Sequence, residues 1–203
     1  MKDANQVLQA LKEGNARFLE GKSSQCSYAS LQKIKDYAKS GQSPKAVILC
    51  CSDSRAPVEI IFDQDIGDIF VIRVAGNVVA PSLVGSVEFA VNAFKTSLVI
   101  VMGHSDCGAV RATLDYIDGD RNLASDNIHD IVSRIKPHIS YLSKIKGLSD
   151  EDKMHHATHA NVIAGVDQLT HSSRLLEELA SKGEITIIGA VLELATGRVE
   201  FIQ

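Results

Sequence analysis

Apolar residues recur along the chain at two spacings, which predict helices alternating with strands. Residues 3–20 carry apolar side chains at helical spacing, and a second, shorter helix is predicted at about 28–40. Continuous apolar runs at Ala46–Cys51 and Ser97–Gly103 are typical of parallel strands covered on both faces. The remaining predictions are a strand at 68–77 ending in a glycine turn, helices at 81–94, 108–117, 125–146 and 151–181, and two last strands at 184–194 and 199–203 joined by a hairpin turn.

This alternation predicts an α/β fold in which helices flank a mostly parallel central β-sheet. The last two strands are expected to form an antiparallel edge, and residues 1–40 are expected to form an N-terminal helical arm. The chain shows no internal repeat, low-complexity segment or linker, so a single domain over residues 1–203 is the simplest interpretation.

The composition narrows the range of partners. The chain has 203 residues, of which 45% are hydrophobic, and a net charge of −4 from 21 basic and 25 acidic residues. It has no run of lysine or arginine that would bind nucleic acid, and no stretch of 18 apolar residues that would enter a membrane. The N-terminal segment is amphipathic and mixed in charge, unlike a signal peptide, so a cytoplasmic location is expected. An export signal removed ahead of residue 1 is the alternative.

The four cysteines, Cys26, Cys50, Cys51 and Cys107, raise the question of what their thiols do. Cys50 and Cys51 are neighbours on a predicted strand, so their side chains face opposite sides of the sheet and are poorly placed to bond each other. A chain of this length rarely needs disulfides, and without an export signal metal binding or catalysis is the better use of the thiols with polar neighbours. Cys50 is expected to point into the core.

Polar side chains follow two of the predicted strands. Cys51, Asp53 and Arg55 come after the first strand, and His104 and Cys107 come after the third. Ligands of open α/β sheets bind where the carboxyl ends of the strands meet, and thiolates and imidazole are the ligands that zinc prefers. Each motif alone would also fit a small core cysteine or a locally hydrogen-bonded histidine. Together, at matching strand ends, they favour a metal site.

The motifs "CSDSR", "FVIRVAGN", "GHSDCGAV" and "GAVLELATGRVEFI", in this order after "GNARF", resemble those of the β-class carbonic anhydrases. This resemblance implies one Zn²⁺ per chain, bound by Cys51, His104 and Cys107, and reversible hydration of carbon dioxide to bicarbonate and a proton through a zinc-bound hydroxide. It makes Asp53 and Arg55 the catalytic pair. Asp53 either hydrogen-bonds the hydroxide, with Arg55 holding it, or becomes a fourth zinc ligand in an inactive form.

The resemblance extends to residues around the substrate. Gln42 matches a glutamine that hydrogen-bonds substrate in plant-like members, and Phe70 matches an aromatic residue lining the pocket. Phe89 stands where many members have tyrosine, so a contact made by that hydroxyl is absent. The backbone N–H of Gly108 is a further candidate for holding substrate, because glycine permits close approach. The chain has no tryptophan, so the inhibitory bicarbonate site of another subgroup is not expected and the plant-like, non-allosteric subgroup fits best.

Members of the family are homodimers or homotetramers with the active site at the dimer interface, so Gln42 and Phe89 are expected to act across that interface. Two alternatives stay open: the same chemistry on a substrate such as carbon disulfide, and a structural or redox-sensing zinc module. A structural site closes with four protein ligands, whereas this set offers three and an Asp–Arg pair. His155 and His159 share a helix face, for which solvent or an interface is favoured over a second metal.

Overall fold

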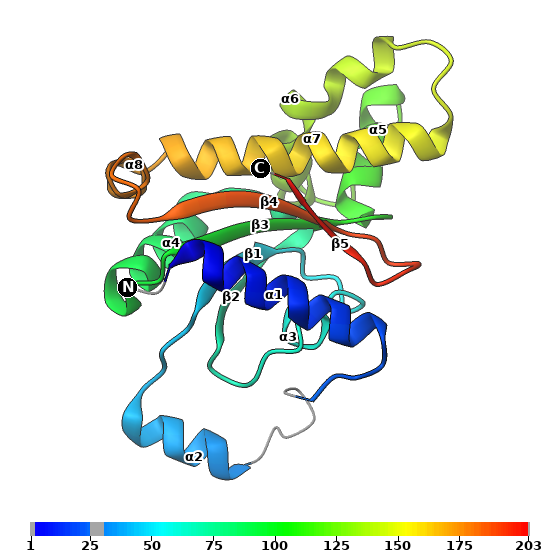
Figure 1. Ribbon diagram of the computed structural model, residues 1–203. Coiled ribbons are helices and arrows are strands. Elements are labelled where there is room, and N and C mark those ends of the chain that lie inside the picture. The colour runs from blue at the N-terminus through cyan, green and yellow to red at the C-terminus, as the bar shows by residue number, and fades with distance from the viewer. Residues whose placement is uncertain (1–2, 25–30, 203) are drawn as a thin grey trace.

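A five-stranded sheet lies at the centre of the computed structural model, which describes residues 3–24 and 31–202 (Figure 1). The strand order is β2-β1-β3-β4-β5, and every neighbouring pair is parallel except β4 and β5, which are antiparallel. The mostly parallel sheet and its antiparallel edge confirm the fold expected from the sequence. The strands are β1 (Ala46–Cys50), β2 (Ile69–Arg73), β3 (Leu98–His104), β4 (Thr186–Leu192) and β5 (Val199–Ile202).

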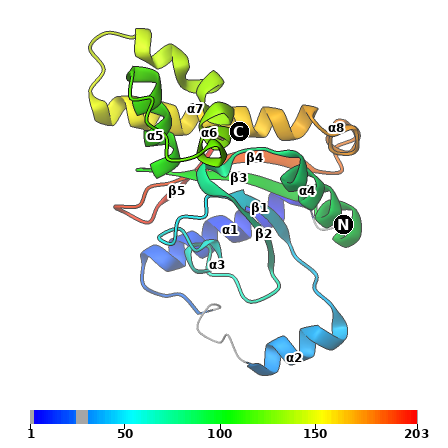
Figure 2. The same ribbon diagram turned by 180° about the vertical axis from the view of Figure 1, so that it is seen from behind.

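The helices form layers on both faces of the sheet. Figures 1 and 2 show α1 on one face and α7 on the other, with α5 and α6 beside the N-terminal part of α7 and α2 standing apart from the sheet. Within the described ranges, no helix is long and apolar enough to span a membrane. The helices are α1 (Ala4–Leu19), α2 (Leu31–Ser40), α3 (Val58–Ile61), α4 (Pro81–Phe94), α5 (Gly108–Asp118), α6 (Asp126–Ile139), α7 (Asp150–His171) and α8 (Arg174–Ser181), with 3₁₀ turns η2 (Ala75–Asn77) and η3 (Ser140–Lys144).

Strand β1 is buried along its whole length because helices cover both of its faces. Ile48 and Cys50 pack into a cluster with α1 and α3, whereas Val47 and Leu49 pack into a cluster with α4, α7 and α8. Each fully buried aliphatic side chain stabilises the fold by about 1.5–3 kcal/mol relative to exposure. The continuous apolar run in the sequence thus corresponds to a strand covered on both faces.

Two of the predicted helix boundaries were wrong. The helix predicted at 151–181 is divided into α7 and α8, because Ser173 caps α8 by accepting a hydrogen bond from the N–H of Leu176. The helix predicted at 125–146 ends at Ile139 and continues only as the tighter turn η3; Pro137, within α6, has no N–H to donate. Helix α3 was not predicted. Residues 28–30 of the predicted second helix, and Cys26, lie outside the described residues.

Candidate metal centre

The carboxyl ends of β1 and β3 deliver the candidate ligands to one place. The strands are parallel and in register, with Cys50 opposite Met102, so Cys51 follows β1 at the level where β3 reaches His104. Cys107 precedes α5 as its N-cap residue, three positions after His104. Parallel pairing, rather than proximity in sequence, therefore brings Cys51 to the other two residues.

Three potential metal-binding atoms converge there. The ligand atoms of Cys51, His104 and Cys107 all lie within 4.8 Å of one another, and the two sulfur atoms are 3.9 Å apart. All three residues are buried. Two sulfur atoms and one imidazole nitrogen are a donor set that suits Zn²⁺.

The two ring nitrogens of the His104 imidazole have different surroundings. Nδ1 lies 2.8 Å from the backbone oxygen of Ser105, so Nδ1 carries the hydrogen and Nε2 presents its lone pair. Nε2 is buried and has no hydrogen-bond partner among the residues that the structure describes. Burial opposes protonation of His104, but the adjacent Cys51 sulfur and the Ser105 carbonyl outweigh it and raise its pKa. The buried Nε2 is therefore the nitrogen through which His104 could bind a metal ion.

The two thiols of the cluster shift each other's pKa in opposite directions. The hydrogen bond between the two sulfur atoms lowers the pKa of Cys51 to about 4; burial opposes this shift, while His104 and the N–H of Gly76 support it. The same contact, with burial, raises the pKa of Cys107. Burial raises the pKa of Cys50, outside the cluster, to about 12. The contact between the two sulfur atoms thus favours one negative charge on the pair, while burial keeps the Cys50 thiol neutral in the core.

Asp53 and Arg55 form a bidentate ion pair beside the cluster. Arg55 Nε donates to Asp53 Oδ1 at 3.0 Å and Nη2 donates to Oδ2 at 2.8 Å, while the backbone N–H of Arg55 closes a turn onto Oδ1. These hydrogen bonds hold the pKa of Asp53 well below its usual range, although burial opposes the shift. Asp53 Oδ2 lies 3.8 Å from Nε2 of His104. An ionised carboxylate therefore borders the candidate ligand atoms.

Arg73 contacts this loop, a role that the sequence did not predict. It ends β2, in register with Cys50. Its Nε donates to the backbone oxygen of Cys51 at 3.0 Å and its Nη2 to that of Asp53 at 2.5 Å. The only sequence signal was a charged residue at the end of an apolar strand in "FVIRVAGN". Arg73 braces the loop that carries both residues.

The candidate substrate residues lie in two places. Gly108 begins α5 next to Cys107, and a Cβ built there would meet no atom within 4 Å, which leaves open space beside its backbone. Gln42 is exposed and precedes the start of β1, and Phe70 pairs with Val47 near that start. Phe89 lies 6.2 Å from Phe70 between ring centroids.

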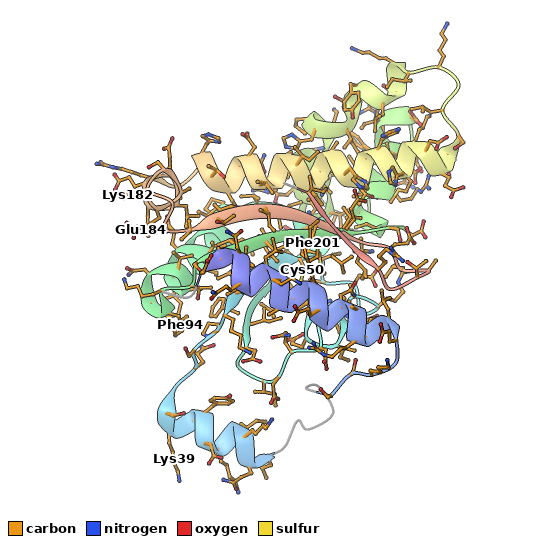
Figure 3. All side chains as sticks on the ribbon, in the orientation of Figure 1. Lys39, Cys50, Phe94, Lys182, Glu184 and Phe201 are labelled. Atoms are coloured by element: carbon orange, nitrogen blue, oxygen red, sulfur yellow. The ribbon has the colours of Figure 1, made fainter. Side chains whose placement is uncertain are left out.

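The candidate metal centre therefore lies at the strand ends opposite to Gln42, Phe70 and Phe89 of the same chain. The ring of Phe94 is 5.9 Å from that of Phe70, and Phe94 is labelled in Figure 3. There it lies on the same side of the molecule as Glu184 and apart from Cys50. From Val47 to Cys51 the strand direction alone spans about 13 Å. Within one chain the fold brings together the three ligands, the Asp53–Arg55 pair and Gly108, but not these three residues.

His155 and His159 stack on one face of α7, with ring centroids 4.2 Å apart. His159 Nε2 lies 3.4 Å from a carboxylate oxygen of Glu200. Among the described residues, only Cys51, His104 and Cys107 meet the distance criterion for a group of three metal ligands. The two α7 histidines do not add a second such group there.

Comparison with known proteins gives a consistent result. The family model described as "Carbonic anhydrase" matches residues 46–199. A carbonic anhydrase of Mycolicibacterium smegmatis is 40% identical over 191 residues, which cover 94% of this chain and 89% of the relative. Carbonic anhydrase 2 of Mycobacterium tuberculosis is 39% identical over 193 residues, covering 93% of this chain and 88% of the relative.

Solved structures show the same fold. The structure of the β-carbonic anhydrase CcaA matches with a TM-score of 0.74 and 25% identity, covering 96% of this chain and 98% of the other. A structure from a study of two tetrameric β-carbonic anhydrases of Sordaria macrospora matches with a TM-score of 0.72 and 24% identity, covering 97% and 96%.

Proposed function

Since this chain belongs to the β-class carbonic anhydrases and is a carbonate dehydratase, we propose that it hydrates carbon dioxide reversibly at one zinc ion held by Cys51, His104 and Cys107. The products are bicarbonate and a proton. The observation that carries the proposal is the convergence of the three ligand atoms within 4.8 Å beside the Asp53–Arg55 ion pair. Bound there, zinc would act as a Lewis acid that lowers the pKa of a coordinated water.

Asp53 orients the attacking oxygen. Its carboxylate accepts a hydrogen bond from the water, which turns an oxygen lone pair toward the carbon of carbon dioxide. Arg55 keeps Asp53 in this position by binding both carboxylate oxygens. The same carboxylate is the candidate fourth ligand of an inactive form. Its Oδ2 lies 3.8 Å from Nε2 of His104, so a short movement of Asp53 would bring it among the other ligand atoms.

Gly108 holds an oxygen of the substrate through its backbone N–H. It is the first residue of the 11-residue helix α5, where the backbone N–H groups point outward and favour negative charge. The open space beside its Cα leaves room for carbon dioxide or bicarbonate. This arrangement stabilises the charge that develops on the substrate as bicarbonate forms.

A second copy of the chain completes the site. In the part of the chain that the structure describes, β2 is an edge strand of the sheet. One side of β2 is therefore available to pair with a strand of another copy. Phe89 is 57% exposed, and α2, which stands apart from the sheet in Figure 1, exposes Leu31, Ile34 and Tyr37. Covering this surface in a homodimer would bring Gln42, Phe70 and Phe89 toward the partner's metal centre. Pairs of dimers would give a homotetramer.

Measuring zinc content and carbon dioxide hydration on the same zinc-loaded sample tests the proposal. We expect about one zinc per chain and rapid hydration at pH 8.5. Full zinc occupancy without hydration would contradict it and favour a structural or redox-sensing zinc module. Turnover of carbon disulfide without turnover of carbon dioxide would assign the centre to the other substrate. A cytoplasmic location is part of the proposal, supported by the free thiols of Cys50, Cys51 and Cys107.

A further inference from the structure

Asn161 is a polar residue on the face of α7 that packs against the rest of the fold. It is 5% exposed, and α7 residues around it, such as Ala157, Val162 and Leu169, are buried and apolar. An amide in such surroundings is costly unless it is hydrogen-bonded. Its Nδ2 donates to the backbone oxygen of Gly76, 85 positions earlier in the chain, at 2.9 Å.

Gly76 holds a backbone conformation that few residues adopt. Its φ is +68° and its ψ is 17°, in the left-handed region. A Cβ at this position would lie 2.8 Å from Cδ1 of Ile135 and 3.0 Å from Cβ of Ala109, so α5 and α6 press on it from outside. The backbone at Gly76 is therefore confined by packing on one side and by Asn161 at its carbonyl.

The N–H of Gly76 donates to the sulfur of Cys51 at 3.4 Å. This N–H and the carbonyl bound by Asn161 flank the same Cα, so fixing the carbonyl in the left-handed conformation also fixes the direction of the N–H. A hydrogen bond to a ligating sulfur withdraws electron density from it, and groups that hold metal ligands tune the metal they bind.

We propose that Asn161 is a positioning residue of the metal centre, which aims the Gly76 N–H at the sulfur of Cys51 and so limits electron donation from that thiolate to the metal. The inference rests on the proposed function, because it takes Cys51 to be a metal ligand. Asn161 itself touches neither metal nor substrate. Its effect passes through one hydrogen bond to Gly76 and one from Gly76 to Cys51.

The same helix supplies a matched control. Thr158 lies three positions before Asn161 on α7, is 3% exposed, and its hydroxyl has no hydrogen-bond partner among the described residues. It packs against Gly103 rather than Gly76, with its Cγ2 3.4 Å from the position of a Cβ built there. Thr158→Val removes a buried polar group from the same helix at almost constant shape. It leaves the contact with Gly76 intact.

The test uses cobalt(II) in place of zinc, because a thiolate bound to cobalt(II) gives a charge-transfer absorption band. In Asn161→Leu we expect this band to move to longer wavelength, since Cys51 becomes a stronger donor. Thr158→Val should keep the wild-type band. Should Asn161→Leu fail to fold, Asn161→Ala removes the same donor and should show the same movement of the band.

The band decides between positioning and general packing. If it stays at the wild-type wavelength in a folded Asn161 variant, the proposal is wrong, even where the melting temperature or zinc affinity falls. If the wild-type protein itself shows no thiolate-to-cobalt band, the proposed ligand set fails instead. The two failures are therefore distinguishable in one series of spectra.

Discussion

Cys50 and Cys51 are consecutive residues whose thiols lie in different hydrophobic clusters. Cys50 packs with α1 and α3 on one face of the sheet, whereas Cys51 lies with Cys107 in a cluster formed with α5 and α6. Alternation along the strand turns the two side chains to opposite sides. One thiol therefore belongs to the group that could hold a metal ion and the other packs in the core, although both are buried cysteines.

This difference predicts opposite results for two alanine variants. Cys107→Ala removes one of three ligands, so bound zinc should fall from about one ion per chain to nearly none. Cys50→Ala removes a sulfur of similar burial and should keep its zinc. Elemental analysis after dialysis against a weak chelator measures both. Full zinc occupancy in Cys107→Ala would show that the ligand set is wrong.

Asp53→Ala should separate metal binding from catalysis. The carboxylate lies beside the ligand atoms but on Arg55, so its removal should leave zinc occupancy unchanged. Without it, the attacking oxygen is no longer oriented, and kcat/KM for carbon dioxide hydration should fall about 10²–10⁴-fold. Stopped-flow hydration assays on samples of equal zinc content provide the measurement. A variant within about twofold of wild type would remove Asp53 from the mechanism.

Arg73→Lys tests the bracing of the loop. Lysine keeps the charge but lacks the planar fork that reaches the backbone oxygens of Cys51 and Asp53, so zinc affinity should fall about 10-fold or more. Arg134→Lys is the control, because Arg134 also donates to a backbone oxygen, that of Val79, rather than to the loop that carries Cys51 and Asp53. Zinc titration against a competing chelator compares them. Equal affinities in both variants would assign Arg73 to general stability.

The parts of the centre that follow from strand alternation could be predicted from the sequence. Strand β1 is buried and ends just before Cys51, and β3 is buried and ends in His104. Both strand ends therefore lie at one edge of a parallel sheet. The bracing role of Arg73 was not predictable, because it depends on the register that sets Arg73 opposite Cys50. Local spacing carries no information on that register.

The division of the predicted helix at 151–181 was missed for a similar reason. Ser173 caps α8 and also donates to the carboxylate of Glu88 on α4 at 2.5 Å. Serine occurs within helices as well as at their starts, so the choice depends on a partner 85 positions away. Tertiary contacts, rather than local propensity, end α7 where it does.

The attachment of α2 is expected to depend on pH through Asp65. Burial opposes ionisation of this carboxyl, but the hydrogen bond from Lys33 and that from the Ile66 N–H outweigh it and lower its pKa. Because the ionised form is favoured in the fold, its stabilising contribution is present above about pH 4 and is lost as the pH falls through the lower folded pKa. Asp65→Asn should therefore reduce amide protection over residues 31–40 at pH 7.

Hydrogen exchange checks this prediction, with Asp36→Asn as the control. Asp36 lies on α2 itself and accepts a hydrogen bond from Gln32 of the same helix, so its loss should leave the attachment unchanged. Below the folded pKa of Asp65, wild type and Asp65→Asn should show equal protection over 31–40. A difference that persists after Asp65 has become protonated would mean that another contact responds to the substitution.

A site shared between two copies predicts complementation between inactive variants. Gln42 lies toward the opposite strand ends from the metal centre of its own chain, so it would serve the partner's site, and Gln42→Ala should lower activity about 10²-fold. Refolding Asp53→Ala and Gln42→Ala together places both intact residues at one of the two sites in each mixed dimer. Activity should then recover to about a quarter of wild type.

The control mixes Asp53→Ala with Cys107→Ala. Each of these substitutions damages the metal centre of its own chain, so the two variants should not rescue each other. Activity equal to the mean of the two separate variants would confine each site to a single chain.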